Sequence, residues 1–448
     1  MRLTEVLNFV AVILVPVFAG PVQSPSLALP QTVSAHWAAV RKMFESSYKA
    51  YGKFAWGHDD LLPLSESYSD DRNSWGASIC DAMTTMVSAH AFCMCTQCSP
   101  LGAQIDTLSV FETTIRYLGS LLSAYELSDK KYPELLDKAR ELLTNCENND
   151  IPYGFLDFST NTPVVQISNI AEAGTLTLEW ATLSKYTGND TYRALAENSA
   201  KHIASLPAPF PSLAIQGIDP QNGSFVGGQV AAVDSTIRHL LRYSTSRNNN
   251  TMNVTYHTSS HLACFHGGKW ILGGKLFKNE TIVNCGLALV DACINTYLST
   301  VTDIGPETFA YISSGGNLPE LTPQDLAFYN QHGFYITDAN YDMRPEMLES
   351  NFYAWRATGD TKYLENAARV LHSFNRYLNT TGGAFAGIVD VNDVASETID
   401  YVLPCSFWFS EVLKYLYLTF DDPEHISLDE YVFNTEAHPF KAPPAKNI

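Results

Sequence analysis

Apolar side chains recur at spacings of three and four residues over long stretches of the chain. One such run contains Phe111, Ile115, Leu118, Leu122 and Tyr125, and another contains Leu348, Phe352 and Trp355. This spacing places apolar side chains on one face of an α-helix, whereas the two-residue alternation of half-buried strands is scarce. The pattern therefore predicts an all-α fold.

Three polar segments that resemble one another interrupt the helical runs, at residues 127–132, 186–192 and 357–363. The last two contain a glycine in a polar turn, which is typical of the joint of an αα-hairpin. The tyrosines that end the segments are 60 and 171 residues apart, and 171 is three steps of 57. A repeat of about 57 residues predicts about seven hairpins between residues 33 and 440.

The repeat fits both a linear solenoid and a closed ring of hairpins. We favour one closed α/α toroid over residues 33–440, without an internal domain boundary, because a ring needs no capping repeats. The polar insert 244–257 is expected to be a loop, and the tail beyond residue 439 is expected to fray.

Composition and charge narrow the class of protein. The chain has 448 residues, of which 46% are apolar, so it can bury a large core and is not intrinsically disordered. It carries 28 basic and 47 acidic residues, a formal net charge of −19. An acidic protein without a basic cluster repels phosphate backbones, so we exclude nucleic acid as a partner.

The N-terminal region predicts entry into the secretory pathway. Arg2 precedes an apolar run from residue 9 to 19, and we interpret residues 1–22 as a signal peptide. Pro16 inside the run argues against a buried N-terminal helix, and the run is too short to span a bilayer. Six acceptor sequons predict N-glycosylation, at Asn189, Asn222, Asn249, Asn253, Asn279 and Asn379. Membrane attachment is expected only if the signal is not cleaved.

Nine cysteines, an odd number, leave at least one without a partner inside the chain. Cys93, Cys95 and Cys98 have a spacing that would suit either a zinc knuckle or disulfides. Disulfides are favoured because no histidine pair stands at ligand spacing and the lumen is oxidising.

Several acidic residues are embedded in apolar, aromatic segments. Glu112 and Arg116 are four residues apart and can pair on one helix face. Asp234 follows a mostly apolar segment. Glu307 follows Gly-Pro at an expected helix start. Any one of these acids could form only an ion pair or a cap. Several acids that converge on one cavity are what glycoside hydrolysis needs, as one protonates the leaving oxygen and another activates water.

Glu346 and Glu349 follow Pro345, which suits the first helical position. In the first turn of that helix, the dipole favours the ionised carboxylate of Glu346. This environment suits a general base.

Ordered segments along residues 35–440 resemble class I α-1,2-mannosidases of glycoside hydrolase family 47. They are residues 75–82, 111–119, 121–125, 171–176, 261–265 with 267–268, 304–307, 344–346 with 349–350, 406–411, 413–417 and 433–439. The resemblance implies an (α/α)7 barrel and a calcium-dependent, inverting exo-hydrolysis of α-1,2-linked mannose from oligomannose N-glycans.

The resemblance also implies roles for individual residues. The catalytic acids would be Glu112, Asp234, Glu307 and Glu346, with Glu346 as the base and the proton donor open among the other three. Arg116 beside Glu112 makes that acid an awkward direct donor, so Asp234 stays a candidate. Substrate would contact Arg116, Glu172, Arg344, Glu349 and Phe407.

The resemblance assigns the calcium ion to the hydroxyl and carbonyl of Thr435. Calcium takes six to eight oxygens, so its shell would be mostly water held by carboxylates such as Glu349 and Glu436. A disulfide between Cys264 and Cys293 is implied as well.

Three positions depart from the family pattern. Thr84 and Cys405 stand where the family has acids, and Arg238 stands where another acid is expected. These changes should weaken calcium binding or reshape the pocket beyond the cleaved sugar. We expect a monomeric enzyme of the secretory pathway, either secreted or in the lumen of the ER or Golgi. Secretion is favoured because the C-terminal residues do not form a retention signal. The alternative is an oligomannose-binding, lectin-like protein of glycoprotein quality control that has lost turnover.

Overall fold

The computed structural model describes residues 21–72, 74–88, 107–142, 151–157, 159–160, 162–207, 215–230, 243–244, 255–312, 321–400 and 406–442. The interpreted signal peptide therefore lies almost wholly outside the described residues. Asp234, Arg238 and Cys405 also lie outside them, as do Cys93, Cys95, Cys98, Asn249 and Asn253.

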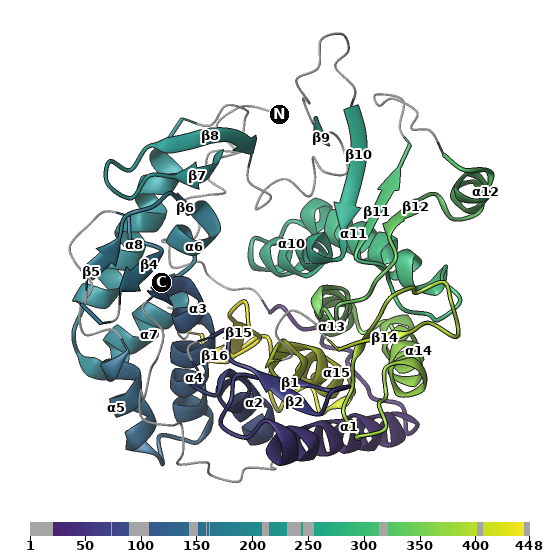
Figure 1. Cartoon of the computed structure of the whole chain (residues 1–448), viewed down its shortest axis with the longest axis horizontal. Helices are drawn as coiled ribbons and strands as arrows, with labels where there is room; N and C mark the ends of the chain where they lie inside the picture. Colours follow the sequence, from purple (N-terminus) through teal and green to yellow (C-terminus); the bar gives the residue numbers. More distant parts are fainter. Residues whose placement is uncertain are drawn as a thin grey trace.

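The described helices form a ring, and the chain passes around it from the N-terminus toward the C-terminus (Figure 1). Their bounds are α1 Val33–Phe54, α2 Ala77–Ser88, α3 Val110–Glu112, α4 Gly119–Leu127, α5 Pro133–Glu141, α6 Ile170–Gly174, α7 Thr177–Thr187, α8 Thr191–Ser205, α10 Phe265–Leu276, α11 Glu280–Leu298, α12 Pro323–His332, α13 Glu346–Thr358, α14 Lys362–Tyr377 and α15 Leu413–Phe420. Two π-helical segments, Thr113–Leu118 and Trp408–Val412, lead into α4 and α15, and a 3₁₀ turn, His261–Cys264, leads into α10.

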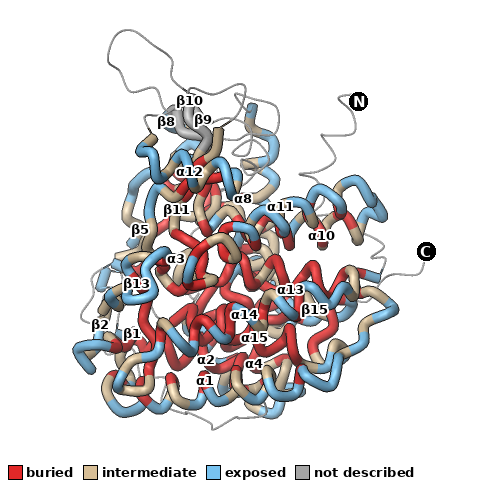
Figure 2. Tube along the Cα trace, turned by 90° about the vertical axis from the view of Figure 1, so that its right-hand side faces the viewer, coloured by how far each residue is buried: buried red, intermediate tan, exposed pale blue. Residues whose placement is uncertain are grey.

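Burial separates inner from outer helices. In α2, 11 of 12 residues are buried, and in α15 all eight are buried. In α5, by contrast, only two of nine residues are buried. A helix that is covered on all sides belongs to an inner layer, and an amphipathic one to the outer layer. Buried residues accordingly gather inside the molecule when it is seen from the side (Figure 2).

The three predicted hairpin joints are present. Gly188 connects α7 to α8 and Gly359 connects α13 to α14, each with φ of 72°, the left-handed conformation that ends a helix at low cost. The segment between α4 and α5 uses Asp129 and Lys130 at positive φ instead. The prediction of helical hairpins at these places was therefore correct.

Short antiparallel strands connect the helices. They are β1 Asp60–Leu62, β2 Ser67–Ser69, β3 Thr107–Ser109, β4 Phe155–Asp157, β5 Thr162–Val164, β6 Ser168–Asn169, β7 Ile215–Ile218, β8 Phe225–Val230, β9 Tyr243–Ser244, β10 Thr255–Ser260, β11 Thr308–Tyr311, β12 Tyr335–Asp338, β13 Gly387–Ile388, β14 Thr398–Ile399, β15 Tyr431–Phe433 and β16 Pro439–Lys441. The largest sheet has the order β12-β11-β10-β9.

Two loop predictions need correction. The insert expected to be a loop over 244–257 ends in β10, because Thr255–Ser260 pairs with β9 and β11. The tail expected to fray beyond Pro439 begins as β16, which pairs with β15 from Tyr431–Lys441 to Phe433–Pro439.

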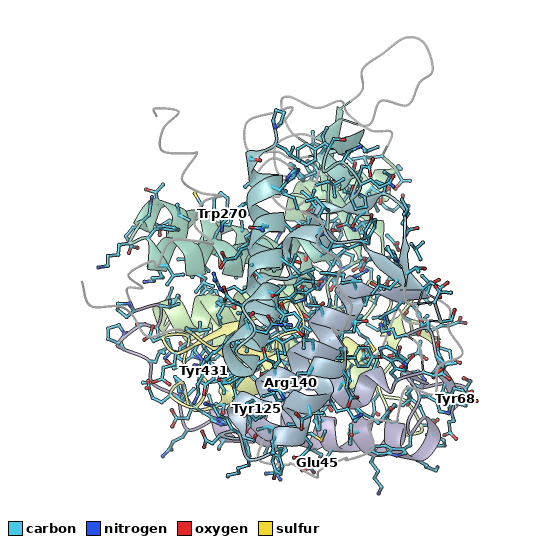
Figure 3. All side chains as sticks on the ribbon, turned by 90° about the vertical axis from the view of Figure 1, so that its left-hand side faces the viewer. Glu45, Tyr68, Tyr125, Arg140, Trp270 and Tyr431 are labelled. Atoms are coloured by element: carbon cyan, nitrogen blue, oxygen red, sulfur yellow. A yellow bond between two sulfur atoms is a disulfide. The ribbon has the colours of Figure 1, made fainter. Side chains whose placement is uncertain are left out.

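The β15–β16 hairpin approaches the ring from the side opposite to β2. In Figure 3, Tyr68 of β2 and Tyr431 of β15 lie toward opposite sides of the molecule. The turn of this hairpin is folded by Asn434, whose side-chain oxygen accepts from the backbone N–H groups of Glu436 and His438. Its side-chain nitrogen donates to the carbonyl of Ile115, 2.9 Å away, so the turn rests on the first π-helical segment.

Helix α11 is long and apolar enough to cross a membrane by length and composition, with a mean hydropathy of 1.3. It packs against α10 in the ring, however, and a disulfide ties it to the turn before α10.

The first described residues pack against the C-terminal part of the chain. Val22 and Gln23 are buried, and the N–H of Val22 donates to Asp429.

Candidate active site

Glu112 lies at the end of α3, where the hydroxyl of Ser109 caps the helix by accepting from its N–H. Its Oε2 accepts from Nε of Arg116 at 2.7 Å, which confirms the predicted pairing across one helical turn. The Glu112 side chain is 38% exposed, whereas that of Arg116 is 7% exposed. The carboxylate of Glu112 is thus partly exposed, and the buried guanidinium of Arg116 pairs with it.

Arg116 links three distant segments beneath Glu112. Its Nη1 lies 2.7 Å from Oε2 of Glu436 and 3.2 Å from both Oδ2 of Asp81 and Oγ of Ser406. A buried guanidinium needs such partners, because an unpaired buried charge is costly. The arrangement joins α2, the first π-helical segment, the β15–β16 turn and the start of the last inner helix at one point.

Glu307 is held by Arg344, whose Nε lies 2.8 and 2.7 Å from its two carboxylate oxygens. Burial raises the pKa of Glu307, and the charge of Arg344 opposes that rise. The expected helix start at Glu307 was wrong: Gly305 and Pro306 lead instead into β11, which begins at the next residue and pairs with β10 and β12.

Glu346 opens α13 and is 8% exposed, so it lies in the first turn as predicted, with Pro345 as the N-cap residue instead of the first helical residue. Its Oε2 lies 2.8 Å from Nδ1 of His261, whose other ring nitrogen lies 2.6 Å from the hydroxyl of Tyr297. His261 also donates its backbone N–H to the carbonyl of Glu307. The backbone of one candidate acid thus positions the partner of another.

Further carboxyl groups gather around Glu346 in the interior. Burial raises the pKa of Glu349 to about 8, with the charge of Glu346 adding to it. Burial also raises the pKa of Glu436 to about 8, and the pKa of Glu411 well above its usual value. The charges of Glu436, Glu346 and Glu349 each add to the shift of Glu411.

A divalent cation fits this set of oxygen donors. Burial disfavours the ionised form of these carboxyl groups, and a hard cation beside them would favour it again. Thr435 is exposed at the tip of the β15–β16 turn, beside buried Glu436. Within the described residues, no three His, Cys, Asp or Glu side chains converge closely enough to hold an ion by themselves.

Beneath the hairpin turn lies the first departure from the family pattern. The ammonium of Lys414 is buried and donates to Oγ1 of Thr84 and to the carbonyl of Ala437, both at 2.7 Å. Nδ1 of His438 lies 2.8 Å from the same hydroxyl. The hydroxyl oxygen of Thr84 is thus hydrogen-bonded to two buried nitrogen groups, the ammonium of Lys414 and the ring of His438.

The other residues predicted to bind substrate lie on two sides of the ring. Glu172, in α6, forms contacts within its own loop, with Ser168 and with Asn169, which caps the helix. Phe407 is buried, 7% exposed, directly before the second π-helical segment. The described contacts do not join either residue to the acids.

Besides His261, sequence reasoning missed Arg72 and Asp60. Nη1 of Arg72 lies 2.7 Å from Oδ2 of Asp60, and its Nε lies 3.8 Å from Oε2 of Glu112. Asp60 in turn accepts from the backbone N–H of Ser406. The only available signal was an arginine after three polar residues in a loop, which does not indicate what it contacts.

Cys264 and Cys293 form a disulfide with an S–S distance of 2.08 Å, the pairing that the family resemblance implies. The sequons at Asn189, Asn222, Asn279 and Asn379 are exposed, as glycosylation requires.

The model of "Glycosyl hydrolase family 47" matches residues 43–237 and 230–442 of the chain. A probable mannosyl-oligosaccharide α-1,2-mannosidase 1B of Aspergillus niger is 34% identical over 472 aligned positions, which cover 90% of this chain and 91% of the relative. A mannosyl-oligosaccharide α-1,2-mannosidase 1B of Aspergillus phoenicis is 32% identical, covering 94% and 96%.

Among solved structures, an α-1,2-mannosidase from Trichoderma reesei superposes with a TM-score of 0.78 at 31% identity, covering 91% of this chain and 99% of that one. The ring of helical hairpins is therefore the (α/α)7 barrel that was expected, and the all-α prediction is confirmed. With the family model matching most of its length and relatives above 30% identity, the chain belongs to glycosyl hydrolase family 47 and is a glycosidase.

Proposed function

We propose that this glycosidase removes terminal α-1,2-linked mannose from oligomannose N-glycans of glycoproteins, by a calcium-dependent reaction that inverts the anomeric carbon. The names of the relatives support the substrate class. The observation that carries the mechanism is the environment of Glu346, which is hydrogen-bonded to His261 and, within the described residues, to no arginine. We further propose that the protein acts as a glycosylated monomer in the secretory pathway.

Glu346 serves as the general base in this proposal. His261 donates from Nδ1 to Oε2, which fixes the plane of the carboxylate. Within the described residues no hydrogen bond engages Oε1, so this oxygen can accept a proton from the attacking water. An inverting reaction needs such a base on the face of the sugar opposite to the leaving group.

The proton donor is proposed to be Asp234, with Glu307 as the second candidate. A protonated Glu112 would lose its ion pair with Arg116, and a protonated Glu307 would lose that with Arg344. Burial nevertheless raises the pKa of Glu307, which favours the protonated form that an acid catalyst needs. Substrate contacts are proposed for Arg116, Arg344, Glu349, Glu172 and Phe407.

Calcium is proposed to bind Thr435 through its hydroxyl and carbonyl, with Glu349 and Glu436 holding the surrounding water. When bound, the ion would supply positive charge to sugar and water oxygens at the floor of the barrel. Glu349 and Glu436 are raised in pKa to about 8 without it, so binding should release protons from them at neutral pH.

Proton NMR of the products would test linkage and stereochemistry together. The purified protein is incubated with the methyl glycoside of an α-1,2-linked mannobiose and with its α-1,3 and α-1,6 isomers, so that all free mannose comes from the cleaved residue, and the first anomer of this mannose is recorded. The proposal expects mannose release mainly from the α-1,2 isomer, and this mannose should first appear as the β anomer. Release of α-mannose would contradict the inverting mechanism. Binding of oligomannose without any release would instead support the lectin-like alternative.

A further inference from the structure

Tyr297 lies in α11 and is buried, with 1% of its surface exposed. Its hydroxyl is 2.6 Å from Nε2 of His261, and Nδ1 of the same ring is 2.8 Å from Oε2 of Glu346. The three side chains therefore form a hydrogen-bonded line from the interior of the helical ring to the proposed base.

The chemistry of these groups fixes the direction of both hydrogen bonds. An ionised carboxylate only accepts, so the proton between His261 and Glu346 must stay on Nδ1. In a neutral imidazole the other nitrogen is then an acceptor, and only the hydroxyl of Tyr297 can supply the proton for it. Burial raises the pKa of Tyr297 well above its usual value, with the charges of Glu346 and Glu307 adding to it, so the hydroxyl keeps its proton.

We propose that Tyr297 is a positioning residue for catalysis: its hydroxyl donates to Nε2 of His261, holds the ring in place and thereby orients the carboxylate of Glu346 toward the attacking water. This inference rests on the proposed role of Glu346 as the base.

The backbone provides a slot for the Tyr297 ring. A Cβ atom at Gly305 would lie 2.4 Å from both Cδ2 and Cε2 of Tyr297, closer than packed atoms can approach. Glycine at position 305 therefore leaves the space that the ring fills. The ring of Tyr341 packs against both members of this hydrogen bond. Its centroid lies 6.4 Å from that of Tyr297 and 5.8 Å from that of His261.

The disulfide joins the two segments that carry this hydrogen bond. Cys264 ends the 3₁₀ turn that begins with His261, and Cys293 precedes Tyr297 by one helical turn of α11. The covalent bond thus limits how far His261 and Tyr297 can separate. Around them, Tyr341 donates to the carbonyl of Arg344, whose side chain carries the charge nearest to Glu307.

The variant Tyr297→Phe tests the proposal because it keeps the ring in its slot and removes one oxygen. We expect kcat for mannose release from oligomannose to fall about tenfold, with KM changed less than about twofold. Tyr51→Phe is the matched control, since Tyr51 is equally buried and its hydroxyl also makes a 2.6 Å hydrogen bond, to the carbonyl of His58, on the outer helix α1. This control should lose stability but keep kcat.

A spectroscopic readout separates positioning from a merely structural role. In nitrogen NMR of histidine-labelled protein, the His261 resonances are assigned by their loss in His261→Gln. The wild type should show an Nδ1-protonated ring whose Nε2 accepts a hydrogen bond, and Tyr297→Phe should shift the Nε2 resonance because that hydrogen bond is lost. An Nε2-protonated His261 in the wild type would overturn the proposal even if no variant folded.

Glu346→Gln distinguishes failure of the inference from failure of the proposed mechanism. If Glu346→Gln keeps full kcat, Glu346 is not the base and both ideas fall. If Glu346→Gln is inactive while Tyr297→Phe keeps the wild-type kcat and Nε2 resonance, only the role of Tyr297 is wrong.

Discussion

The ammonium of Lys414 lies 2.7 Å from the hydroxyl of Thr84, at a position where the family resemblance leads one to expect an aspartate. Burial lowers the pKa of Lys414 to about 7, although nearby carboxylates oppose that shift. A buried cation is thus held by two neutral oxygens, the second being the carbonyl of Ala437 in the turn that carries Thr435. Asp81, Glu411 and Glu436 act on Lys414 through their charges, but none of them is among its direct hydrogen-bond partners here.

Two substitutions at Thr84 should therefore change stability in opposite directions. Thr84→Val removes the hydroxyl and should lower the free energy of unfolding by about 1–3 kcal/mol, because Lys414 keeps one partner fewer. Thr84→Asp should raise it by about 1 kcal/mol or more at pH 7, since a carboxylate beside an already buried ammonium compensates its charge. Urea unfolding measures both. A loss of stability in Thr84→Asp as large as that in Thr84→Val would contradict this account of Lys414.

Glu179 predicts a pH dependence of stability. Burial raises its pKa to about 7 against the hydrogen bond from Asn434, which lies 2.7 Å away. A carboxyl whose pKa is higher in the folded state contributes stability below its unfolded pKa of about 4.3, and this contribution is lost as pH rises through about 7. The wild type should lose up to about 3 kcal/mol more than Glu179→Gln between pH 4.5 and 7.5.

Urea unfolding of the wild type and Glu179→Gln at several pH values isolates this group, because all other carboxyls are common to both proteins. The glutamine keeps an oxygen for Asn434. Parallel pH profiles for the two proteins would show that Glu179 is ionised throughout.

Arg72 should affect catalysis through Glu112. Replacement of Arg72 by Met removes the guanidinium that lies between Asp60 and Glu112, and we expect kcat to fall about tenfold. Asp71→Asn is the matched control, because Asp71 also lies beside Arg72, at 3.9 Å, but is 46% exposed. Steady-state kinetics of both variants test this prediction. Equal kcat values for the two variants would assign Arg72 a structural role only.

A substrate with an activated leaving group separates the acid from the base. The variants Asp234→Asn, Glu307→Gln and Glu346→Gln are compared on oligomannose and on an α-mannosyl fluoride. Fluoride leaves with little help from an acid, so loss of the acid should matter roughly a hundredfold less on this substrate. We expect such recovery for Asp234→Asn and none for Glu346→Gln. Recovery in Glu307→Gln alone would assign the acid to Glu307.

Local patterns predicted the helical part of the site well. Glu112 and Arg116 are neighbours through helical periodicity alone, and Glu346 lies in the first turn of α13 because a proline precedes it. Such relationships depend on residues within one turn, so the sequence contains them directly.

The rest of the site depends on contacts between distant segments. Glu307 was placed at a helix start, because a glycine and a proline before an acid resemble one, but pairing with β10 and β12 makes the next four residues a strand. Arg72 was not noticed, since its partners Asp60 and Glu112 meet only when the ring is assembled. Tertiary pairing overrides local preference at Glu307, and the contacts of Arg72 have no local signal.

Calcium-dependent turnover is the central claim and can be measured directly. Purified protein is stripped with a chelator, and free mannose released from a labelled oligomannose glycan is quantified with and without added calcium, beside Glu346→Gln. The account predicts release by the wild type with calcium, at least tenfold less without it, and almost none from Glu346→Gln. Undiminished release after stripping would contradict the calcium site, and glycan binding without release under any condition would contradict the enzyme activity.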